Sequence, residues 1–336
     1  MSIGLAVFGA GRMGATHVRN AALHVPGAHL IGIGDVDRQA AQRLVDEVRV
    51  GRADDPDALL RDPHVEAVII ATPTQTHADL IARAADSGKH IFCEKPISSG
   101  ISATKRAAER ARKAGVILQV GFQRRFDAEF EAAHRAVKSG ALGEPRFVRL
   151  VGRDHRMPSI AYLRTSGGQF KDQMVHDFDL ARWLFSPFEV EEVYATGSTL
   201  VDPAIAEFND VDTSIAVLRF GGGPIGVIDG SREAIYGYDI RAELHGSKGL
   251  FLVGHGRLRN GELLDSRQAT PDVESFIEHF ADAYRDEIID FVSAIRDRRE
   301  PRVGADDDLE ALRIAIAADR SRASHRPVAL AEVGDE

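Results

Sequence analysis

Several residue classes are scarce in this chain of 336 residues, and each shortage excludes a class of protein. Cys93 is the single cysteine, so an internal disulfide is excluded and a reducing compartment is favoured. No apolar run approaches the roughly 20 residues that a membrane-spanning helix needs. Lysine and arginine (42) are outnumbered by aspartate and glutamate (51), without any basic block, which argues against nucleic acid as a partner.

The apolar N-terminus, residues 1–8, lacks the basic leader of a signal peptide and runs directly into a glycine-rich turn. It is better explained as a first β-strand than as a secretion signal. We therefore expect a cytoplasmic protein.

The pattern of apolar runs predicts two domains with a boundary near Gly121. Before it, short Val- and Ile-rich runs alternate with helix-like segments, which predicts right-handed βαβ crossovers and a doubly wound parallel sheet. After it, consecutive strand-like runs are joined by glycine turns, which predicts an α+β domain with a mostly antiparallel sheet, closed by two helical stretches. The expected strands are 3–8, 28–34, 67–71, 90–93 and 116–120, then 146–151, 190–199, 213–220, 225–231 and 239–244, and the closing helices are 274–297 and 306–323. We expect domains at 1–121 and 122–336.

A glycine-rich turn follows the first expected strand. Gly9-Ala10-Gly11-Arg12-Met13-Gly14 matches G-x-G-x-x-G and opens a helix-like segment, the context that the dinucleotide-binding fingerprint requires. Its glycines permit a tight turn and bring a pyrophosphate close to the N-terminus of the helix. The first domain is therefore predicted to bind a dinucleotide of the NAD type.

Asp35 ends the second expected strand, about 20 residues beyond the glycines, where an acidic side chain binds the ribose hydroxyls. A carboxylate there repels a 2′-phosphate, so NAD is favoured over NADP. The alternative is purely structural, since Asp35 and Asp37 both stand where an N-cap of the next helix is expected.

Two further segments are expected at the carboxyl edge of the sheet, where ligands enter such folds. Thr72 and Pro73 follow the third strand and are predicted to line the cofactor site, while His77 is either a contact or a residue of the first helical turn. Glu94-Lys95-Pro96 follows the fourth strand. Lys95 is predicted to stabilise a substrate alkoxide there, although an isolated lysine is more often a solvated charge.

In the second half, Asp172 and His176 lie four residues apart at the start of an apolar helical run. Side chains at this spacing project from one face of a helix. A carboxylate beside an imidazole suits a general base that takes a hydroxyl proton. The alternative is a helix cap and a solvated histidine.

Together these residues resemble the Gfo/Idh/MocA oxidoreductases, and among them the inositol 2-dehydrogenases. The resemblance rests on the glycine fingerprint, Glu94-Lys95-Pro96, the segment 119–127 and Asp172 with His176. It implies that Lys95, Asp172 and His176 are catalytic and that Glu94 lies at the cofactor. It also implies a polyol site, with candidate residues Arg124, Asp154, His155 and Tyr236, or Tyr238 in place of Tyr236.

The implied reaction is NAD-dependent oxidation of a secondary hydroxyl, from myo-inositol to 2-keto-myo-inositol (scyllo-inosose). Met157 departs from the proline or asparagine common in related sequences, which leaves the preferred polyol open. The alternatives are scyllo-inositol, another cyclic polyol or a glucose-like sugar, and, in another class, a non-catalytic NAD-binding sensor. The resemblance further implies an open second sheet that mediates a homo-oligomer, a dimer or tetramer. No histidine spacing suggests a metal site, and we expect none.

Overall fold

The computed structural model describes residues 2–254, 264 and 275–335, which form two compact units. The first unit runs to Phe126 and includes Ala281–Leu309, and the second consists of Asp127–Phe280 and the chain from Glu310. This division differs from the boundary expected at Gly121, because residues 122–126 and 281–309 belong to the first unit. Across the described ranges, every helix is too short or too polar to traverse a bilayer.

The first unit is built on a parallel sheet of six strands in the order β3-β2-β1-β4-β5-β6. Its strands are β1 (Ile3–Phe8), β2 (Ala28–Gly34), β3 (Arg52–Asp54), β4 (Ala67–Ile70), β5 (His90–Glu94) and β6 (Leu118–Gly121). The chain moves outward from β1 in one direction and then resumes at β4 on its other side. Such a reversal opens a crevice at the carboxyl ends of the central strands, where ligands of doubly wound sheets bind. The predicted doubly wound fold is confirmed.

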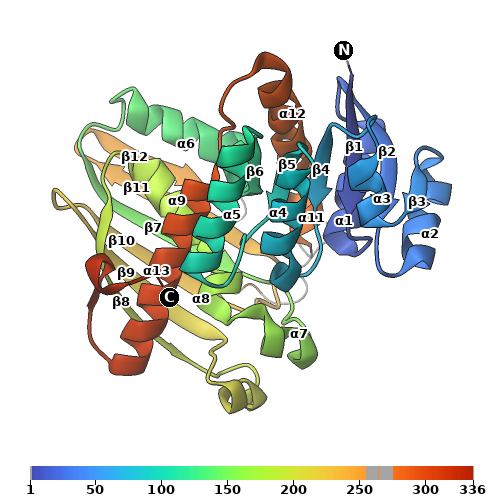
Figure 1. Cartoon of the computed structure of the whole chain (residues 1–336). Helices are drawn as coiled ribbons and strands as arrows, with labels where there is room; N and C mark the ends of the chain where they lie inside the picture. The colour runs from blue at the N-terminus through green and yellow to red at the C-terminus, as the bar shows by residue number, and fades with distance from the viewer. Residues whose placement is uncertain (1, 255–263, 265–274, 336) are drawn as a thin grey trace. The chain divides into compact units, whose positions relative to one another are not determined.

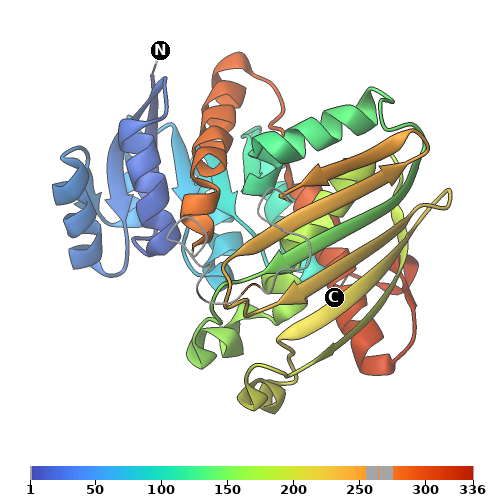
Figure 2. The ribbon, with the colours of Figure 1, turned by 180° about the vertical axis from the view of Figure 1, so that it is seen from behind.

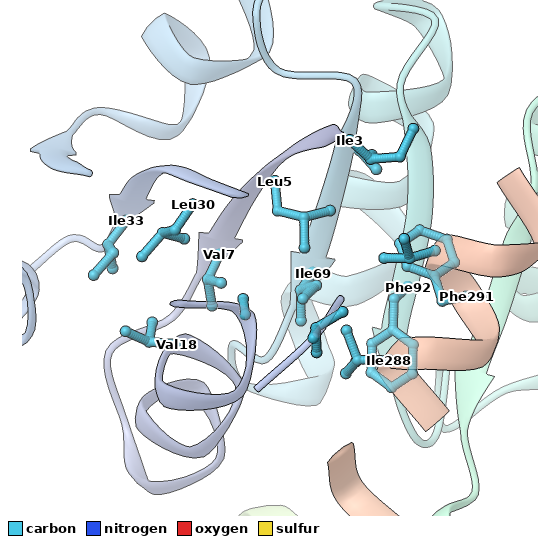
Figure 3. Close-up of a cluster of buried hydrophobic side chains, with 14 of the residues drawn as sticks. Ile3, Leu5, Val7, Val18, Leu30, Ile33, Ile69, Phe92, Ile288 and Phe291 are labelled. Carbon is cyan, nitrogen blue, oxygen red and sulfur yellow. The ribbon is translucent and has the colours of Figure 1, made fainter. Parts of the chain in front are cut away.

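The helices of this unit are α1 (Arg12–Leu23), α2 (Arg38–Val48), α3 (Pro56–Arg61), α4 (His77–Asp86), α5 (Ile101–Ala114) and α12 (Ala281–Asp297), with short 3-10 turns η1 (Thr74–Thr76) and η2 (Gln123–Phe126). Figure 1 shows α12 entering this unit although it lies far along the chain. Ile288 and Phe291 of α12 join Leu5, Ile69 and Phe92 of the sheet in one buried cluster (Figure 3). This apolar packing explains why a late helix belongs to the first unit.

The second unit holds a mixed, mostly antiparallel sheet of seven strands in the order β12-β11-β7-β10-β9-β8-β13. Its strands are β7 (Pro145–Arg153), β8 (Val190–Ser198), β9 (Thr213–Phe220), β10 (Ile225–Ser231), β11 (Asp239–Gly246), β12 (Gly249–Val253) and β13 (Val328–Ala329). Only the β7–β10 pair is parallel among the described strands of this sheet. The predicted α+β fold with a mostly antiparallel sheet is confirmed.

One face of this second sheet is covered. The helices of the unit are α6 (Ala128–Lys138), α7 (Ile160–Ser166), α8 (Gln169–Asp172), α9 (Val175–Phe185) and α11 (Phe276–His279), with 3-10 turns η3 (Pro203–Phe208) and η6 (Leu330–Glu332), and α13 (Ala305–Ser324) crosses the division at Leu309. A Cβ on Gly152 of β7 would lie 2.6 Å from Asp177 of α9, and one on Gly230 of β10 would lie 3.0 Å from Met174.

Because side chains alternate along a strand, the neighbours of Gly152 and Gly230 point to the opposite face. Figure 2 shows that second face of the sheet, with the helices of the unit behind it. The predicted helix at 274–297 is two helices, α11 and α12, in different units. Residue 274, where it was expected to start, lies outside the described residues.

Candidate active site

The glycine turn joins β1 to α1 as predicted, and its glycines differ in what surrounds them. Gly9 has φ +102°, and a Cβ there would lie 2.5 Å from the carbonyl oxygen of Ala71. A Cβ on Gly14 would lie 1.9 Å from the carbonyl oxygen of Gly9. A Cβ on Gly11 would meet nothing within 4 Å among the described atoms. The turn therefore packs tightly on its inner side and is open at Gly11.

Gly11 is also the N-cap of α1, and no side chain of the described residues caps that helix. Arg12 is exposed, and the first turn carries no acidic residue. Uncapped N–H groups and the positive end of the helix dipole attract an anion. Together with the open side of Gly11, this arrangement fits the pyrophosphate of a dinucleotide.

Asp35 lies directly after β2 and holds the turn from the side. Its Oδ2 accepts a hydrogen bond from the N–H of Ala10 at 2.6 Å, and its Oδ1 accepts one from the N–H of Asp37 at 2.7 Å. Asp37, in contrast, caps α2 by accepting from the N–H groups of Gln39 and Ala40. The cap of α2 is therefore Asp37, while Asp35 is fixed beside the glycine turn with lone pairs left for ribose hydroxyls.

His77, predicted as a possible cofactor contact, is 1% exposed at the start of α4. Its Nε2 lies 2.8 Å from the carbonyl oxygen of Thr72, and its Nδ1 lies 2.9 Å from that of Pro96. Burial lowers the pKa of His77, and the two carbonyl acceptors only partly offset that effect. The ring thus lies between the Thr72-Pro73 segment after β4 and the Lys95-Pro96 segment after β5, and in its neutral form its one N–H donates to one of the two carbonyls.

Lys95 follows the last residue of β5 and is half-buried. The loop after it is held on two sides, by His77 at the Pro96 carbonyl and by Asp308 Oδ2, which accepts from the N–H of Ile97 at 3.1 Å. Glu94 points into the unit instead, where its Oε1 lies 2.8 Å from His17 Nε2 of α1. The backbone on both sides of Lys95 is therefore fixed, by β5 before it and by the bonds at Pro96 and Ile97 after it. Arg124, in η2 of the same unit, is 3% exposed.

Asp172 and His176 belong to the second unit, and the helix expected to carry both is divided. Asp172 is the last residue of α8, and His176 is the second residue of α9. Asp172 Oδ1 accepts a hydrogen bond from the Tyr162 hydroxyl at 2.9 Å, and its Oδ2 accepts one from Arg232 Nη1 at 3.1 Å. Arg232 is 1% exposed, so a buried cation holds this carboxylate in place.

Gln173, between the two short helices, was not singled out from the sequence. Its Nε2 lies 2.9 Å from Asp154 Oδ2 and 2.7 Å from the carbonyl oxygen of Ser231. Asp154 also donates its own N–H to the Ser231 carbonyl at 2.9 Å. The end of β7, the end of β10 and the α8–α9 turn are therefore joined by one amide. Neither Gln173 nor Arg232 belongs to a local motif that would have revealed this role.

The other predicted substrate residues of this unit have different surroundings. His155 is 8% exposed, with Nδ1 3.1 Å from the carbonyl oxygen of Ala234 and Nε2 accepting from Arg156 Nε at 3.2 Å. Tyr236 accepts from Arg153 Nη1 at 3.0 Å and donates to Asp239 Oδ2 at 2.8 Å. Burial and the Asp239 charge raise the pKa of Tyr236.

Arg153 and Asp239 face away from α9, because their register neighbours Gly152 and Ile240 belong to the covered side. The Tyr236 hydroxyl therefore lies on the face of the sheet opposite to Asp172. Tyr238, the alternative, packs against the rings of Phe276, His279 and Phe280. The structure brings Asp154 to the α8–α9 turn and does not bring the Tyr236 hydroxyl there.

A doubly wound sheet with an open glycine turn, followed by a unit with a mixed sheet and a carboxylate held four residues before a histidine, is the arrangement of a dinucleotide-dependent oxidoreductase. Two family models match this chain: the oxidoreductase family with NAD-binding Rossmann fold at residues 3–122 and the GFO/IDH/MocA C-terminal domain at residues 130–252. The protein belongs to the Gfo/Idh/MocA oxidoreductase family.

Similar proteins point to one branch of that family. The chain is 40% identical to a myo-inositol 2-dehydrogenase of Thermotoga maritima, over 98% of this chain and 99% of that protein. It is 36% identical to a scyllo-inositol 2-dehydrogenase (NAD(+)) of Bacillus subtilis, over 97% and 95%. A solved structure of scyllo-inositol dehydrogenase from Lactobacillus casei, with bound NAD(H) and scyllo-inositol, superposes with a TM-score of 0.89 at 27% identity, over 98% and 100%. The protein is an oxidoreductase whose relatives include inositol 2-dehydrogenases.

Proposed function

We propose that this protein oxidises a secondary hydroxyl of a cyclic polyol with NAD as the hydride acceptor. Myo-inositol is the proposed substrate and 2-keto-myo-inositol the product. The observation that carries this proposal is the carboxylate of Asp172, which Tyr162 and the buried Arg232 hold at the end of α8, four residues before His176 on α9. The similarity to inositol dehydrogenases over nearly the full length of both chains supports the substrate class.

The residues proposed to act are Lys95, Asp172 and His176. When bound, NAD supplies the ring that takes the hydride. His176 Nδ1 is buried, so Nε2 is the nitrogen that accepts the hydroxyl proton. Asp172 orients the imidazole of His176, and the Lys95 ammonium stabilises the alkoxide that develops on the substrate. We place Arg124, Asp154 and His155 at the polyol.

We propose NAD rather than NADP because Asp35 lies beside the glycine turn. Its carboxylate would accept hydrogen bonds from the ribose hydroxyls of NAD and would repel the 2′-phosphate of NADP. Gly9 to Gly14, Thr72 and Pro73 surround the same cofactor. His77 and Glu94 act on that site indirectly, by fixing the backbone around it. His77 lies against the Pro96 carbonyl, and Glu94 bonds to His17.

The test is formation of NADH or NADPH by the purified protein with a panel of myo-inositol, scyllo-inositol and glucose, each with NAD and with NADP. We expect the highest kcat/KM with myo-inositol and NAD. A higher kcat/KM with scyllo-inositol or glucose would replace myo-inositol as the proposed substrate, while the proposed type of reaction would stand. Binding of NAD without turnover of any polyol would instead indicate a sensor.

We also propose a homo-oligomer, a tetramer, formed through the open face of the second sheet. Apolar side chains on that face are unusually exposed, and they are Tyr194 (40%), Ile215 (38%), Ile225 (46%), Leu250 (56%) and Leu252 (48%). An apolar surface of this kind is typical of association sites. Light scattering after gel filtration gives the mass in solution, and Leu250→Lys with Leu252→Lys should reduce it. A wild-type mass of one chain contradicts the proposal.

A further inference from the structure

Three ionisable side chains meet inside the first unit, outside the groups assigned to the chemistry. His17 of α1, Glu94 of β5 and Glu287 of α12 each place one nitrogen or oxygen within 4.8 Å of the others. His17 and Glu287 are 0% exposed, and Glu94 is 9% exposed. The cluster is not a local feature of one loop or one helix end. Its three residues come from separate elements, α1, β5 and α12, that pack around the core of the unit.

The surroundings of this cluster are largely apolar. The His17 ring lies edge-on to Phe92 at 5.3 Å and to Tyr284 at 6.2 Å, measured between ring centres. Glu94 Oε2 lies against β6, where a Cβ on Gly121 would approach it to 3.1 Å. Among the described residues, neither carboxylate oxygen of Glu287 has a hydrogen-bond partner.

The charges of the cluster follow from this environment. His17 Nε2 lies 2.8 Å from Glu94 Oε1, so Glu94 is the carboxylate with a donor. A second buried carboxylate without donors is strongly disfavoured beside the first. Burial, and then the Glu94 charge, raise the pKa of Glu287 well above its usual range. Glu94 is the charged group that acts on Glu287, and no cation among the described residues offsets its effect.

We propose that Glu287 keeps its proton at working pH, so that the cluster carries one negative charge, on Glu94, immediately before Lys95. Glu94 is then a positioning residue. Its bond to His17 anchors the end of β5 and so fixes the backbone from which Lys95 extends. By remaining neutral, Glu287 leaves the cluster with that one negative charge. This inference rests on the proposed role of Lys95.

Protonation is tested without substrate. In an infrared difference spectrum between wild type and Glu287→Gln, we expect the carbonyl band of a protonated carboxylic acid to be present only in the wild type. The neutral isostere should keep the thermal midpoint within about 2 °C. A missing band, or a Gln variant that is much more stable than wild type, overturns a protonated Glu287. One equivalent of divalent metal in the purified protein does so as well, since a metal would require ionised ligands.

The link to Lys95 is tested by activity. At each pH, Glu287→Gln should keep the kcat of NADH formation within about threefold of the wild-type value. Glu94→Gln weakens the bond to His17 that anchors the end of β5, so kcat should fall about tenfold while the KM for NAD stays within about twofold, and Glu94→Asp should partly restore kcat. An unchanged kcat in Glu94→Gln overturns the positioning role. If the wild type oxidises no polyol, the proposed function fails while the infrared result still decides the protonation.

Discussion

At the scale of single residues, two neighbouring aspartates have different tasks. Asp35 bonds to the glycine turn, and Asp37 caps α2. We expect Asp35→Ala to raise the KM for NAD more than tenfold, roughly the loss of one or two hydrogen bonds to a charged acceptor, and to raise the NADP-to-NAD ratio of kcat/KM. Steady-state kinetics with both cofactors measures this.

Asp37→Ala is the matched control for that change. It should destabilise the protein by about 1 kcal/mol through loss of the cap, seen as a lower urea midpoint, with cofactor constants unchanged. If both variants shift the cofactor ratio equally, Asp35 has no special part in choosing NAD.

Asp172 is held by two donors of unequal burial, which predicts unequal effects of their loss. Asp172→Asn removes the negative charge that pairs with the buried Arg232, and we expect kcat to fall by about 10²-fold or more. Tyr162 is 48% exposed, so Tyr162→Phe should lower kcat only a few-fold, by about 1 kcal/mol. Single-turnover rates with saturating NAD separate the two. Equal losses would show that Arg232 does not dominate.

At the scale of elements, sequence patterns located most strands correctly, because apolar runs bounded by glycine are local signals. The strands at Ile3–Phe8, Ala28–Gly34, Thr213–Phe220 and Ile225–Ser231 have the predicted bounds. The short β3 and α3 were not predicted, since three polar strand residues carry no apolar pattern. The division between α8 and α9 was also missed, because Gln173 is held there by bonds to β7 and β10.

The site followed the same rule. The glycine turn, Asp35 and Lys95 were placed correctly at strand ends, since chain order fixes that edge of a parallel sheet. The face occupied by the Tyr236 hydroxyl depends on Arg153 and Asp239 of two other strands, and sequence proximity to Asp239 does not reveal it. Arg232 was missed for a similar reason, since its partner Asp172 lies on α8.

The glycine turn allows folding and binding to be separated. A methyl on Gly14 collides with the Gly9 carbonyl, so Gly14→Ala should fold poorly. Gly11 has φ −74° and open space around its Cβ position, so Gly11→Ala should keep the thermal midpoint while weakening NAD at least tenfold, because the methyl occupies the pyrophosphate space. Calorimetric titration with NAD checks this. Undiminished NAD affinity in Gly11→Ala would place the pyrophosphate elsewhere.

The buried ring of His77 lies between two loops, and its ionisation makes the stability of the folded protein depend on pH. Its pKa is lowered in the folded protein, so the unfolded chain binds a proton first as the pH falls. The contribution of His77 is therefore complete above about pH 6.5 and declines below it, by at most about 1.4 kcal/mol per pH unit. Urea unfolding between pH 5 and 7 should show a shallower slope for His77→Gln. A parallel slope would contradict a neutral buried ring.

At the scale of the whole molecule, the first unit is made from two distant stretches of chain. Phe291 of α12 is fully buried with Phe92 of β5, their ring centres 6.0 Å apart. Phe291→Ala should destabilise this unit by about 3–5 kcal/mol. NAD, which binds the folded unit, should protect the same amides from hydrogen exchange.

Phe185 of α9 is equally buried, at 0% exposed, and belongs to the second unit. Phe185→Ala is therefore the matched control, with the same side chain removed from the other core. We expect Phe291→Ala to speed exchange in β1, β4, β5 and α12, and Phe185→Ala to speed it in α9 and the second sheet. Exchange that rises across 127–280 in the Phe291 variant, and not in β1 or β5, would show that α12 does not stabilise the nucleotide-binding sheet. Its inclusion in that unit would then lack an energetic basis.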